Sequence, residues 1–270
     1  MTPKHQSVTI AVSGMDERQK ELAKELKLRF QPSAVTHTDS PAALSTSFDY
    51  LVLPLKGADE GDHHTEWLNR LDSNTKLLVG KISADVLEYC AEQGIDVISY
   101  IERAEFKIAN AVPTAEGAVK LYMELSKQTV DHSRMLVLGF GHCGKALALR
   151  LKAWGADVTV FARSYADRIA GKSMGLDMRE YKDLPKLARQ KNCIFNTVPY
   201  QILDAAILNS MPKTSIIIDL ASLPGGTDFK LCEELQLTAV HALSLPGRYF
   251  PITAGNILAD TIVNIINETS

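Results

Sequence analysis

The sequence predicts an α/β protein of two domains, each built on a parallel sheet covered by helices. Short β-branched runs alternate with longer helical patterns along the whole chain of 270 residues. This length exceeds one domain of ordinary size and is enough for two cores. A glycine-rich loop between an apolar run and a helical pattern marks the second half as a βαβ unit.

The first half contains alternating strands and helices that end in polar or glycine-containing turns. Strands are expected at Val8–Val12, Tyr50–Leu53, Lys76–Val79 and Asp96–Ser99, with a short one near Val35. Helices are expected at Glu17–Leu28, Glu66–Leu71 and Ala84–Gln93. We read Ser13-Gly14 as a strand–helix turn, because one glycine cannot form a phosphate cradle.

A helix at residues 113–128 is expected to join the two domains. Pro113 and Thr114 are plausible helix-start residues, and Glu116 then falls in the first turn, where a carboxylate suits the helix dipole. Apolar residues follow at helical spacing from Ala118 to Leu125. The first domain is therefore assigned to residues 1–112.

The second half, residues 113–250, repeats the alternation. Strands are expected at Met135–Leu138, Asp157–Phe161, Cys193–Asn196, Ser215–Asp219 and Thr238–His241. Helices are expected at Lys145–Trp154, Asp183–Gln190, Ile202–Asn209 and Phe229–Glu234. A terminal helix from Ala254 to Ile266 follows the last strand. We expect residues 251–270, roughly, to return to the first domain.

Composition argues against several classes of protein. The chain is 46% hydrophobic and 23% charged with a net charge of −3, so no basic field favours nucleic acid. No apolar run is long enough for a membrane helix, and the polar N-terminus is not a secretory signal. The four cysteines are far apart and form no CxxC pair, so we expect a cytoplasmic protein with no metal site.

The glycine-rich loop follows the apolar run Met135–Leu138 and opens into a helical pattern. Its residues are Gly139, Phe140, Gly141, His142, Cys143 and Gly144. In this spacing the first glycine permits a tight turn, the second lets backbone approach a pyrophosphate, and the third lets helix and strand pack closely. Strand, loop, helix and second strand follow in the required order, which predicts a Rossmann dinucleotide-binding domain.

The end of the second strand of this domain bears on cofactor choice. An NAD site usually places an acid there for the ribose hydroxyls, but this chain has Ala162, Arg163 and Ser164. Arg163 can pair with a 2′-phosphate and Ser164 can donate a hydrogen bond to it. The sequence therefore favours NADP, the alternative being that Arg163 is an ordinary surface side chain.

Two further turns are expected at the same edge of the sheet. Thr197, Val198 and Pro199 follow one strand, and Leu220, Ala221 and Ser222 follow the next. Ligands of open α/β sheets lie outside the carboxyl ends of the strands. These turns are expected to line the nicotinamide side of the cofactor.

Six distinctive segments follow one another along the chain: Tyr100-Ile101-Glu102-Arg103, residues 111–117, Ala162-Arg163-Ser164, residues 219–229, Leu245-Pro246-Gly247 and Thr253-Ala254-Gly255. Together they resemble the A subunits of dipicolinate synthase, and the turn chemistry more distantly resembles alanine and 2-hydroxyacid dehydrogenases. The matched segments lie in both halves. His142-Cys143 and Arg248-Tyr249-Phe250 depart from the family pattern.

The resemblance implies NADP-linked oxidation of dihydrodipicolinate to dipicolinate in the mother cell of spore-forming bacteria. It also implies a partner, a flavoprotein-like B subunit, and Leu245 as a further residue at the cofactor. Homo-oligomers are common for this fold. The substrate is a small dicarboxylate, so cations and hydrogen-bond donors are expected between the two domains.

The candidate substrate and catalytic residues are named here with the structural role that some of them could have instead. Arg103 is the candidate cation or an ordinary solvated arginine, and Asn110 and Thr114 are candidate donors. Glu116 is a general base or a helix-capping glutamate. His241 is an acid or base, or a packed histidine at a strand end.

Two other functions remain open on the sequence. The chain could be another NADP-dependent small-acid dehydrogenase of the alanine dehydrogenase group. It could also be a protein that binds NADP for sensing or assembly and performs no turnover.

Overall fold

The computed structural model describes residues 8–43, 48–55 and 63–269. The chain divides into two compact units. Unit 1 is Met1–Asn110 with Phe250–Ser270, and unit 2 is Ala111–Tyr249. Each unit contains a parallel sheet with helices on both faces, so the predicted fold class is confirmed.

The sheet of unit 1 has five parallel strands in the order β2-β1-β3-β4-β5. The strands are β1 (Ile10–Ser13), β2 (Val35–Thr38), β3 (Tyr50–Val52), β4 (Lys76–Val79) and β5 (Asp96–Ser99). Alternate residues of β1 face opposite cores, with Ile10 and Val12 on one face and Ala11 on the other. Helices α2 (His63–Leu68) and α3 (Ala84–Glu92) cover the face of Ala11.

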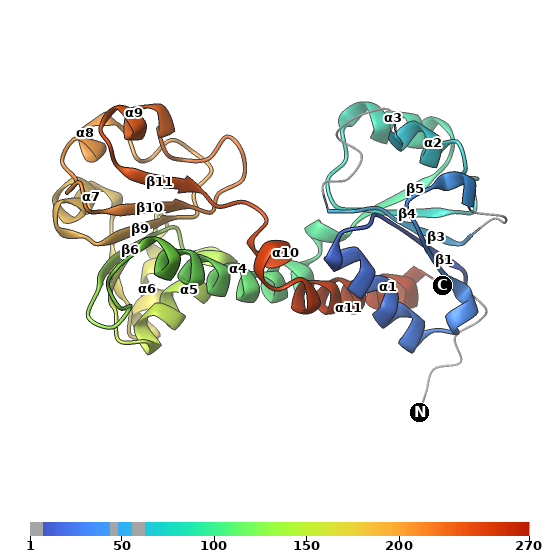
Figure 1. The fold of residues 1–270 in the computed structure, drawn as a ribbon, viewed down its shortest axis with the longest axis horizontal. Helices are drawn as coiled ribbons and strands as arrows, with labels where there is room; N and C mark the ends of the chain where they lie inside the picture. The colour runs from blue at the N-terminus through green and yellow to red at the C-terminus, as the bar shows by residue number, and fades with distance from the viewer. Residues whose placement is uncertain (1–7, 44–47, 56–62, 270) are drawn as a thin grey trace. The chain divides into compact units, whose positions relative to one another are not determined.

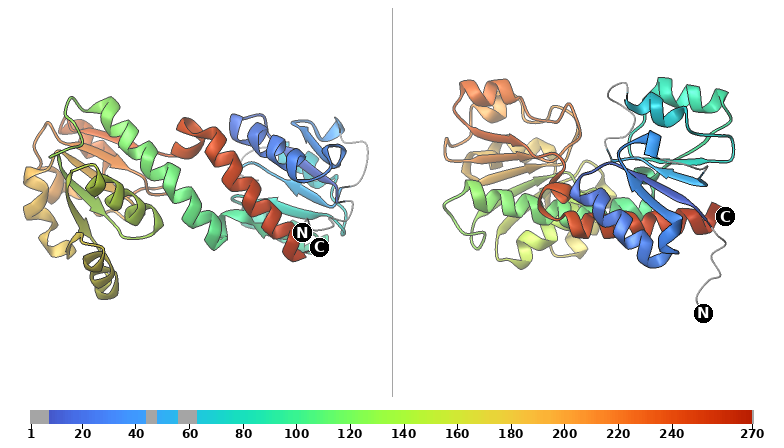
Figure 2. Two further views of the ribbon diagram at one scale, coloured as in Figure 1. Left: turned by 90° about the horizontal axis from the view of Figure 1, so that it is seen from below. Right: turned by 45° about the vertical axis from the view of Figure 1, so that its right-hand side comes forward.

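Helices α1 (Glu17–Arg29) and α11 (Pro251–Thr269) cover the other face and lie side by side (Figures 1 and 2). Leu22 and Leu26 of α1 are buried together with Leu258 and Ile262 of α11. A Cβ on Gly255 would lie 2.7 Å from the Glu21 Cβ, so a glycine lets the two helices approach closely. The C-terminal helix thus returns to the first domain, as predicted.

The sheet of unit 2 has six parallel strands in the order β11-β10-β9-β6-β7-β8. The strands are β6 (Arg134–Leu138), β7 (Asp157–Phe161), β8 (Asp177–Arg179), β9 (Cys193–Asn196), β10 (Ile216–Asp219) and β11 (Thr238–His241). This is the strand order of a doubly wound dinucleotide-binding sheet. The order reverses between β6 and β9, where such sheets bind their ligands.

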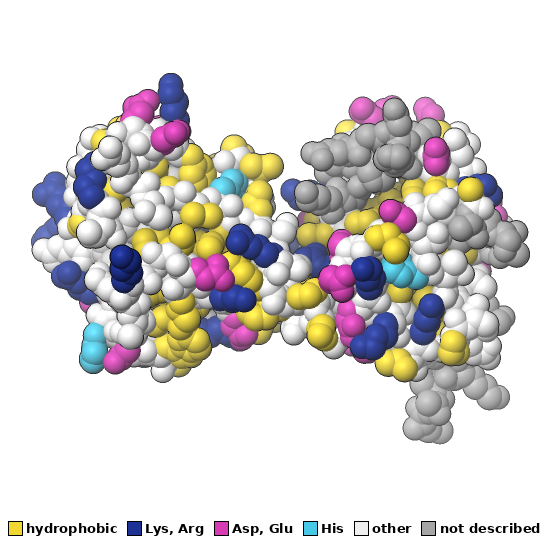
Figure 3. All heavy atoms as spheres, viewed as in Figure 1, with side chains coloured by type: hydrophobic (Ala, Val, Ile, Leu, Met, Phe, Trp, Pro, Cys, Tyr) yellow, Lys and Arg dark blue, Asp and Glu magenta, His cyan; other side chains and the backbone are white. Residues whose placement is uncertain are grey.

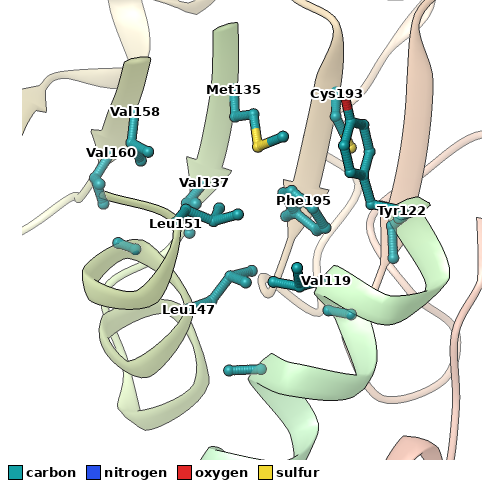
Figure 4. Packing of buried hydrophobic residues seen from close by; sticks show 14 of the residues in the cluster. Val119, Tyr122, Met135, Val137, Leu147, Leu151, Val158, Val160, Cys193 and Phe195 are labelled. Carbon is teal, nitrogen blue, oxygen red and sulfur yellow. The ribbon is translucent and has the colours of Figure 1, made fainter. Parts of the chain in front are cut away.

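One face of this sheet packs on α4 (Ala104–Leu125), α5 (His142–Ala153) and α6 (Tyr165–Ser173). Figure 4 shows Val119 and Tyr122 of α4 and Leu147 of α5 against Val137 and Phe195 of the sheet. The other face packs on α7 (Leu184–Leu187), α8 (Ala205–Leu208) and α9 (Phe229–Glu234).

The predicted start of the joining helix at Pro113 is wrong. Helix α4 begins at Ala104, with Lys107 N–H donating to Arg103 O at 3.0 Å, and Pro113 lies buried inside it. The residues before Pro113 favour a helix, and Phe106 packs edge-on against Tyr100 with the ring centroids 5.9 Å apart. This packing favours a helix start before Pro113, although Pro113 cannot donate a hydrogen bond to Ala109 O. Glu116 consequently lies deep in the helix and not in its first turn.

Besides short 3₁₀ helices, the sequence did not predict α6, β8 and α10 (Leu245–Tyr249). Strand β8 has only three residues, and only Met178 of them is buried, so it carries no apolar pattern. The start of α6 could have been recognised in the sequence, since serine is a favoured N-cap residue. In the structure the Ser164 side chain accepts a hydrogen bond from Asp167 N–H.

Other predicted helices are shorter, shifted or divided in the structure. Helix α2 begins three residues before the expected Glu66. The expected helix at Asp183–Gln190 is α7 flanked by two 3₁₀ turns, and α8 begins only after its N-cap Asp204. Among the described residues, no helix is both long and apolar enough to cross a membrane. On the face seen in Figure 3, basic and acidic side chains are interspersed over each unit.

Candidate functional site

The carboxyl ends of five strands in unit 2 form one row across the sheet. Strand pairing places Phe161, Leu138, Asn196, Asp219 and His241 in that order along the row. The turns predicted to hold a dinucleotide all follow these residues. The sheet topology therefore brings the loops after β6, β7, β9 and β10 to one edge.

Two glycines of the glycine-rich loop have no room for a side chain, whereas the third, Gly141, does. Gly139 has φ +100°, and a Cβ there would lie 2.2 Å from Thr197 Oγ1. A Cβ on Gly144 would lie 2.2 Å from Gly139 O, whereas one on Gly141 would meet no heavy atom within 4 Å. The loop is thus packed against β9 and the start of α5 but leaves space at Gly141, which fits a pyrophosphate in backbone contact.

The two unusual residues of the loop form the first turn of α5. His142 is exposed, whereas Cys143 is half-buried. Burial raises the pKa of the Cys143 thiol, and a hydrogen bond with Thr114 of α4 partly offsets that rise. The structure thus brings Thr114, a predicted substrate donor, next to the glycine-rich loop.

Arg163 is exposed at the end of β7, and its backbone is held by a second arginine. Arg168 donates to Ala162 O at 3.0 Å and to Arg163 O at 2.8 Å. The same guanidinium pairs with Glu180 at 3.0 Å. Ser164 is the N-cap of α6, and its oxygen accepts a hydrogen bond from Asp167 N–H at 3.3 Å. Because the hydroxyl oxygen is the acceptor in this bond, the hydroxyl keeps its own proton as a donor.

Tyr181 lies beside these residues and was not predicted from the sequence. Its ring packs on Phe161 with the centroids 5.8 Å apart. Burial raises the pKa of Tyr181 to about 12, and the backbone of Gly139 and the charge of Arg163 lower it in part. Tyr181 follows the short strand β8, so no sequence pattern pointed to it.

A buried polar network fixes the turns after β9 and β10. The Asp219 carboxylate accepts hydrogen bonds from Asn196 Nδ2 at 3.0 Å and Thr227 Oγ1 at 2.6 Å. It also accepts bonds from the backbone N–H groups of Ala221 and Gly226, at 3.0 and 2.9 Å. Asn196 and Asp219 are fully buried. The turns at Thr197–Pro199 and Leu220–Ser222 are thereby held in place.

His241 is half-buried, and one of its ring nitrogens is committed to the backbone. Its Nε2 lies 2.8 Å from Ala221 O. A carbonyl can only accept, so Nε2 carries a proton and the neutral ring keeps Nδ1 as its basic atom. The ring also stacks on Phe229 with the centroids 5.3 Å apart.

Four other residues predicted to bind substrate or cofactor, or to act in catalysis, have neighbours that could not be read from the sequence. Arg103 donates to Glu105 and Glu268, both at 2.7 Å, which raises the pKa of its guanidinium. Glu116 pairs with Arg150 of α5 at 3.2 Å. Leu245 is 1% exposed, lies in the core of unit 2 and packs on Gly117. Asn110 is half-buried within α4.

No group of three or more histidine, cysteine, aspartate or glutamate side chains is arranged to hold a metal ion within the described part of the chain. The donors at the sheet edge are instead backbone N–H groups, hydroxyls and one exposed arginine. This set suits the phosphates of a dinucleotide.

Comparison with known proteins defines the class of this site. Residues 106–240 match the family described as D-isomer specific 2-hydroxyacid dehydrogenase, NAD binding domain. Fold, glycine-rich loop and this match together define an oxidoreductase of the dehydrogenase type with a nicotinamide-dinucleotide site in unit 2.

The relatives define the family more narrowly. The A subunit of dipicolinate synthase from Bacillus subtilis (strain 168) is 33% identical over 234 residues, which are 87% of this chain and 76% of that protein. The chain belongs to the family of dipicolinate synthase A subunits, which confirms the resemblance found in the sequence.

Two solved structures of this family share the whole fold. The A subunit of dipicolinate synthase from Bacillus halodurans has a TM-score of 0.87 and 25% identity, over 96% of this chain and 98% of that one. The corresponding dipicolinate synthase structure from Bacillus subtilis has a TM-score of 0.85 and 28% identity, over 98% and 97% of the two chains.

Proposed function

We propose that this protein oxidises dihydrodipicolinate to dipicolinate (pyridine-2,6-dicarboxylate) by hydride transfer to NADP. The observation that carries the proposal is a dinucleotide loop left open at Gly141, in a chain that belongs to the dipicolinate synthase A family. The loop supplies the cofactor site, and the family suggests the substrate.

NADP is favoured over NAD by the charge at the end of β7. Residues 162–164 contain an arginine and no acid, and Arg168 fixes the backbone that presents Arg163. A 2′-phosphate there would pair with the Arg163 guanidinium and accept a hydrogen bond from the Ser164 hydroxyl. The first turn of α5 and Gly141 would hold the pyrophosphate.

The reaction needs the loss of a hydride and a proton from the dihydropyridine ring, which becomes aromatic. Bound NADP supplies the hydride acceptor. The protein's part is to hold the ring in line, which can lower the barrier by about 7–11 kcal/mol. If His241 takes the proton, it does so at Nδ1, because Nε2 already carries one.

Arg103 is a weaker candidate for the substrate cation than its sequence suggested. Two carboxylates already compensate its charge. A substrate carboxylate would have to compete with Glu105 and Glu268 for this charge. We therefore assign Arg103 a structural role, and Arg103→Ala is expected to leave the Kd of the substrate unchanged.

A second protein component belongs to the proposal, because the relatives are named as the A subunit of dipicolinate synthase. The direct test mixes the chain with NADP and freshly made dihydrodipicolinate, with and without a B subunit. Ultraviolet absorbance should show dipicolinate and NADPH appearing together. Tight NADP binding with no turnover under either condition would instead favour a sensing or assembly role.

The cofactor assignment has its own test in Arg163→Ala. Loss of a charge-assisted pair should raise the Kd of NADP roughly ten- to a hundredfold and leave the Kd of NAD almost unchanged. Arg179→Ala is the matched control, because Arg179 ends β8 on the same sheet and pairs with Asp177. Equal changes in both Kd values for Arg163→Ala would refute the NADP assignment.

A further inference from the structure

Unit 1 contains a buried arginine that is not part of the dinucleotide site in unit 2. Arg18 lies in the first turn of α1, directly after β1, and is 9% exposed. Its Nε–H has no hydrogen-bond partner among the described residues. Leaving a charged donor buried and unpaired is destabilising, so this arginine requires an explanation beyond folding.

The groups around Arg18 are committed to other partners. Asp16, whose charge raises the Arg18 pKa in part, accepts the α1 N-cap bond from Gln19 N–H through its Oδ1 at 3.0 Å. Tyr100, which also faces Arg18, donates its hydroxyl to Leu53 O at 2.9 Å. Burial lowers the pKa of Arg18 from its ordinary value, but a guanidinium stays charged at neutral pH. Arg18 is therefore a cation, and the Asp16 carboxylate is the acid whose charge acts on it.

The strand order places Arg18 where a doubly wound sheet binds ligands. In the order β2-β1-β3-β4-β5 the direction of winding reverses between β1 and β3. The loop after β1 is rigidly built at this point: Gly14 O lies 2.7 Å from His37 Nε2, and Ser13 O accepts a bond from Gln19 Nε2 at 3.0 Å. Gly14 also packs against Pro54 in the loop after β3.

Helix α11, which packs on α1 at Arg18, carries a second unpaired polar group. Gly255 approaches the backbone of Arg18, since a Cβ on Gly255 would lie 3.0 Å from Arg18 O. The side-chain Oδ1 of the next residue, Asn256, is buried without a partner among the described residues, as is Gln19 Oε1. An amide side chain can turn either its oxygen or its NH₂ group to a ligand.

We propose that Arg18 anchors a carboxylate of the substrate on unit 1, through its Nε–H and one terminal N–H, with Asn256 as a second hydrogen-bonding group. A guanidinium binds a planar carboxylate through two parallel hydrogen bonds, which matches the unpaired Nε–H. The identity of the ligand as the pyridine dicarboxylate rests on the proposed function. The cationic subsite itself rests on unit 1 alone.

The experiment measures binding of pyridine-2,6-dicarboxylate to the full chain by calorimetry in saturating NADP, a mixture that cannot turn over. Arg18→Met should raise the Kd of the dicarboxylate at least tenfold. Arg18→Lys should have a Kd between those of wild type and Arg18→Met, because lysine keeps the charge but cannot form two parallel hydrogen bonds. Lys20→Met is the control on the same helix, since Lys20 is exposed and pairs with Glu17. The Kd of NADP should be the same in all four proteins.

Thermal unfolding separates a binding role from a structural one. Without ligand, Arg18→Met should unfold at the same temperature as wild type or higher, because it removes an unpaired buried charge. A lower unfolding temperature together with unchanged dicarboxylate binding would overturn the assignment. Inorganic phosphate binding as tightly as the dicarboxylate, with the same loss in Arg18→Met, would overturn the carboxylate assignment.

The outcomes also distinguish this subsite from the proposed function. If wild type turns over dihydrodipicolinate and Arg18→Met binds the dicarboxylate normally, only the subsite is refuted. If wild type binds the dicarboxylate through Arg18 but never forms dipicolinate, the subsite is supported and the proposed function fails.

Discussion

At the scale of single residues, the site depends on which glycines are packed and which is open. A Cβ on Gly144 or Gly139 would overlap neighbouring atoms, whereas one on the exposed Gly141 would meet no heavy atom within 4 Å. The sequence predicted the three roles from spacing alone. The structure shows in addition that, of these three positions, only Gly141 could carry a side chain without disturbing the fold.

Gly141→Ala and Gly144→Ala should therefore fail in different ways. Gly141 has φ −71°, which alanine adopts freely, so this variant should keep its unfolding midpoint and lose dinucleotide affinity. Gly144→Ala forces a Cβ against a backbone oxygen, which should cost about 1–3 kcal/mol or more of stability. Urea denaturation and NADPH fluorescence titration measure the two effects. A Gly141→Ala protein that binds NADPH normally would exclude backbone contact at this position.

Asp219 is the residue on which the turns after β9 and β10 depend. Asp219→Asn would turn an NH₂ group toward donors and leave at least one of them unpaired, which should cost about 1–3 kcal/mol. Asp228→Asn is the control, because Asp228 caps α9 by accepting from Leu231 N–H and asparagine caps a helix equally well. Equal unfolding midpoints for the two variants would show that the network contributes little.

Residue partners far apart in the chain could not be read from the sequence. Arg103 was correctly placed after the last strand of unit 1, but its partner Glu268 is 165 positions away. Asn196 and Asp219 were recognised as strand-ending residues, but their hydrogen bond depends on the pairing of β9 with β10. Arg18 carried no signal, because a charged residue in a first helical turn is ordinarily exposed.

At the scale of elements, strands were predicted best. Lys76–Val79, Asp96–Ser99, Asp157–Phe161, Cys193–Asn196 and Thr238–His241 have the observed bounds. These segments are rich in β-branched or aromatic residues and end at polar turns. Helix ends were predicted less well, because packing partners decide them. Helix α4 continues through Pro113, although proline favours a start.

The β7–α6 turn is the element that presents Arg163, and Arg168 holds it. Arg168→Gln should remove the bonds to Ala162 O and Arg163 O, raising the Kd of NADP several-fold with little effect on NAD. Hydrogen exchange should also speed up at residues 162–168. Lys172→Gln, on the same helix but exposed, is the control. Unchanged exchange in Arg168→Gln would show that the turn does not depend on this arginine.

At the scale of the whole molecule, the last helix of the chain completes the first domain. Ile262 of α11 is fully buried with Leu22 and Leu26 of α1, so Ile262→Ala should cost about 2–4 kcal/mol. Hydrogen exchange should show the loss of protection in α1 and β1 and not in β6 or β9. Asn264→Ala, exposed on the same helix, should change neither. Loss of protection throughout unit 2 would contradict the division of the chain.

The proposed transfer of a hydride from the substrate to NADP bound in unit 2 can be followed with an isotope label. The most direct measurement gives the chain ring-deuterated dihydrodipicolinate and NADP, with the B subunit present, and determines the mass of the reduced cofactor. We expect NADPH carrying one deuterium, formed in equal amount with dipicolinate, and none with Gly141→Ala at the same cofactor concentration. Dipicolinate formed with unlabelled NADPH, or with no reduced cofactor at all, would contradict the account.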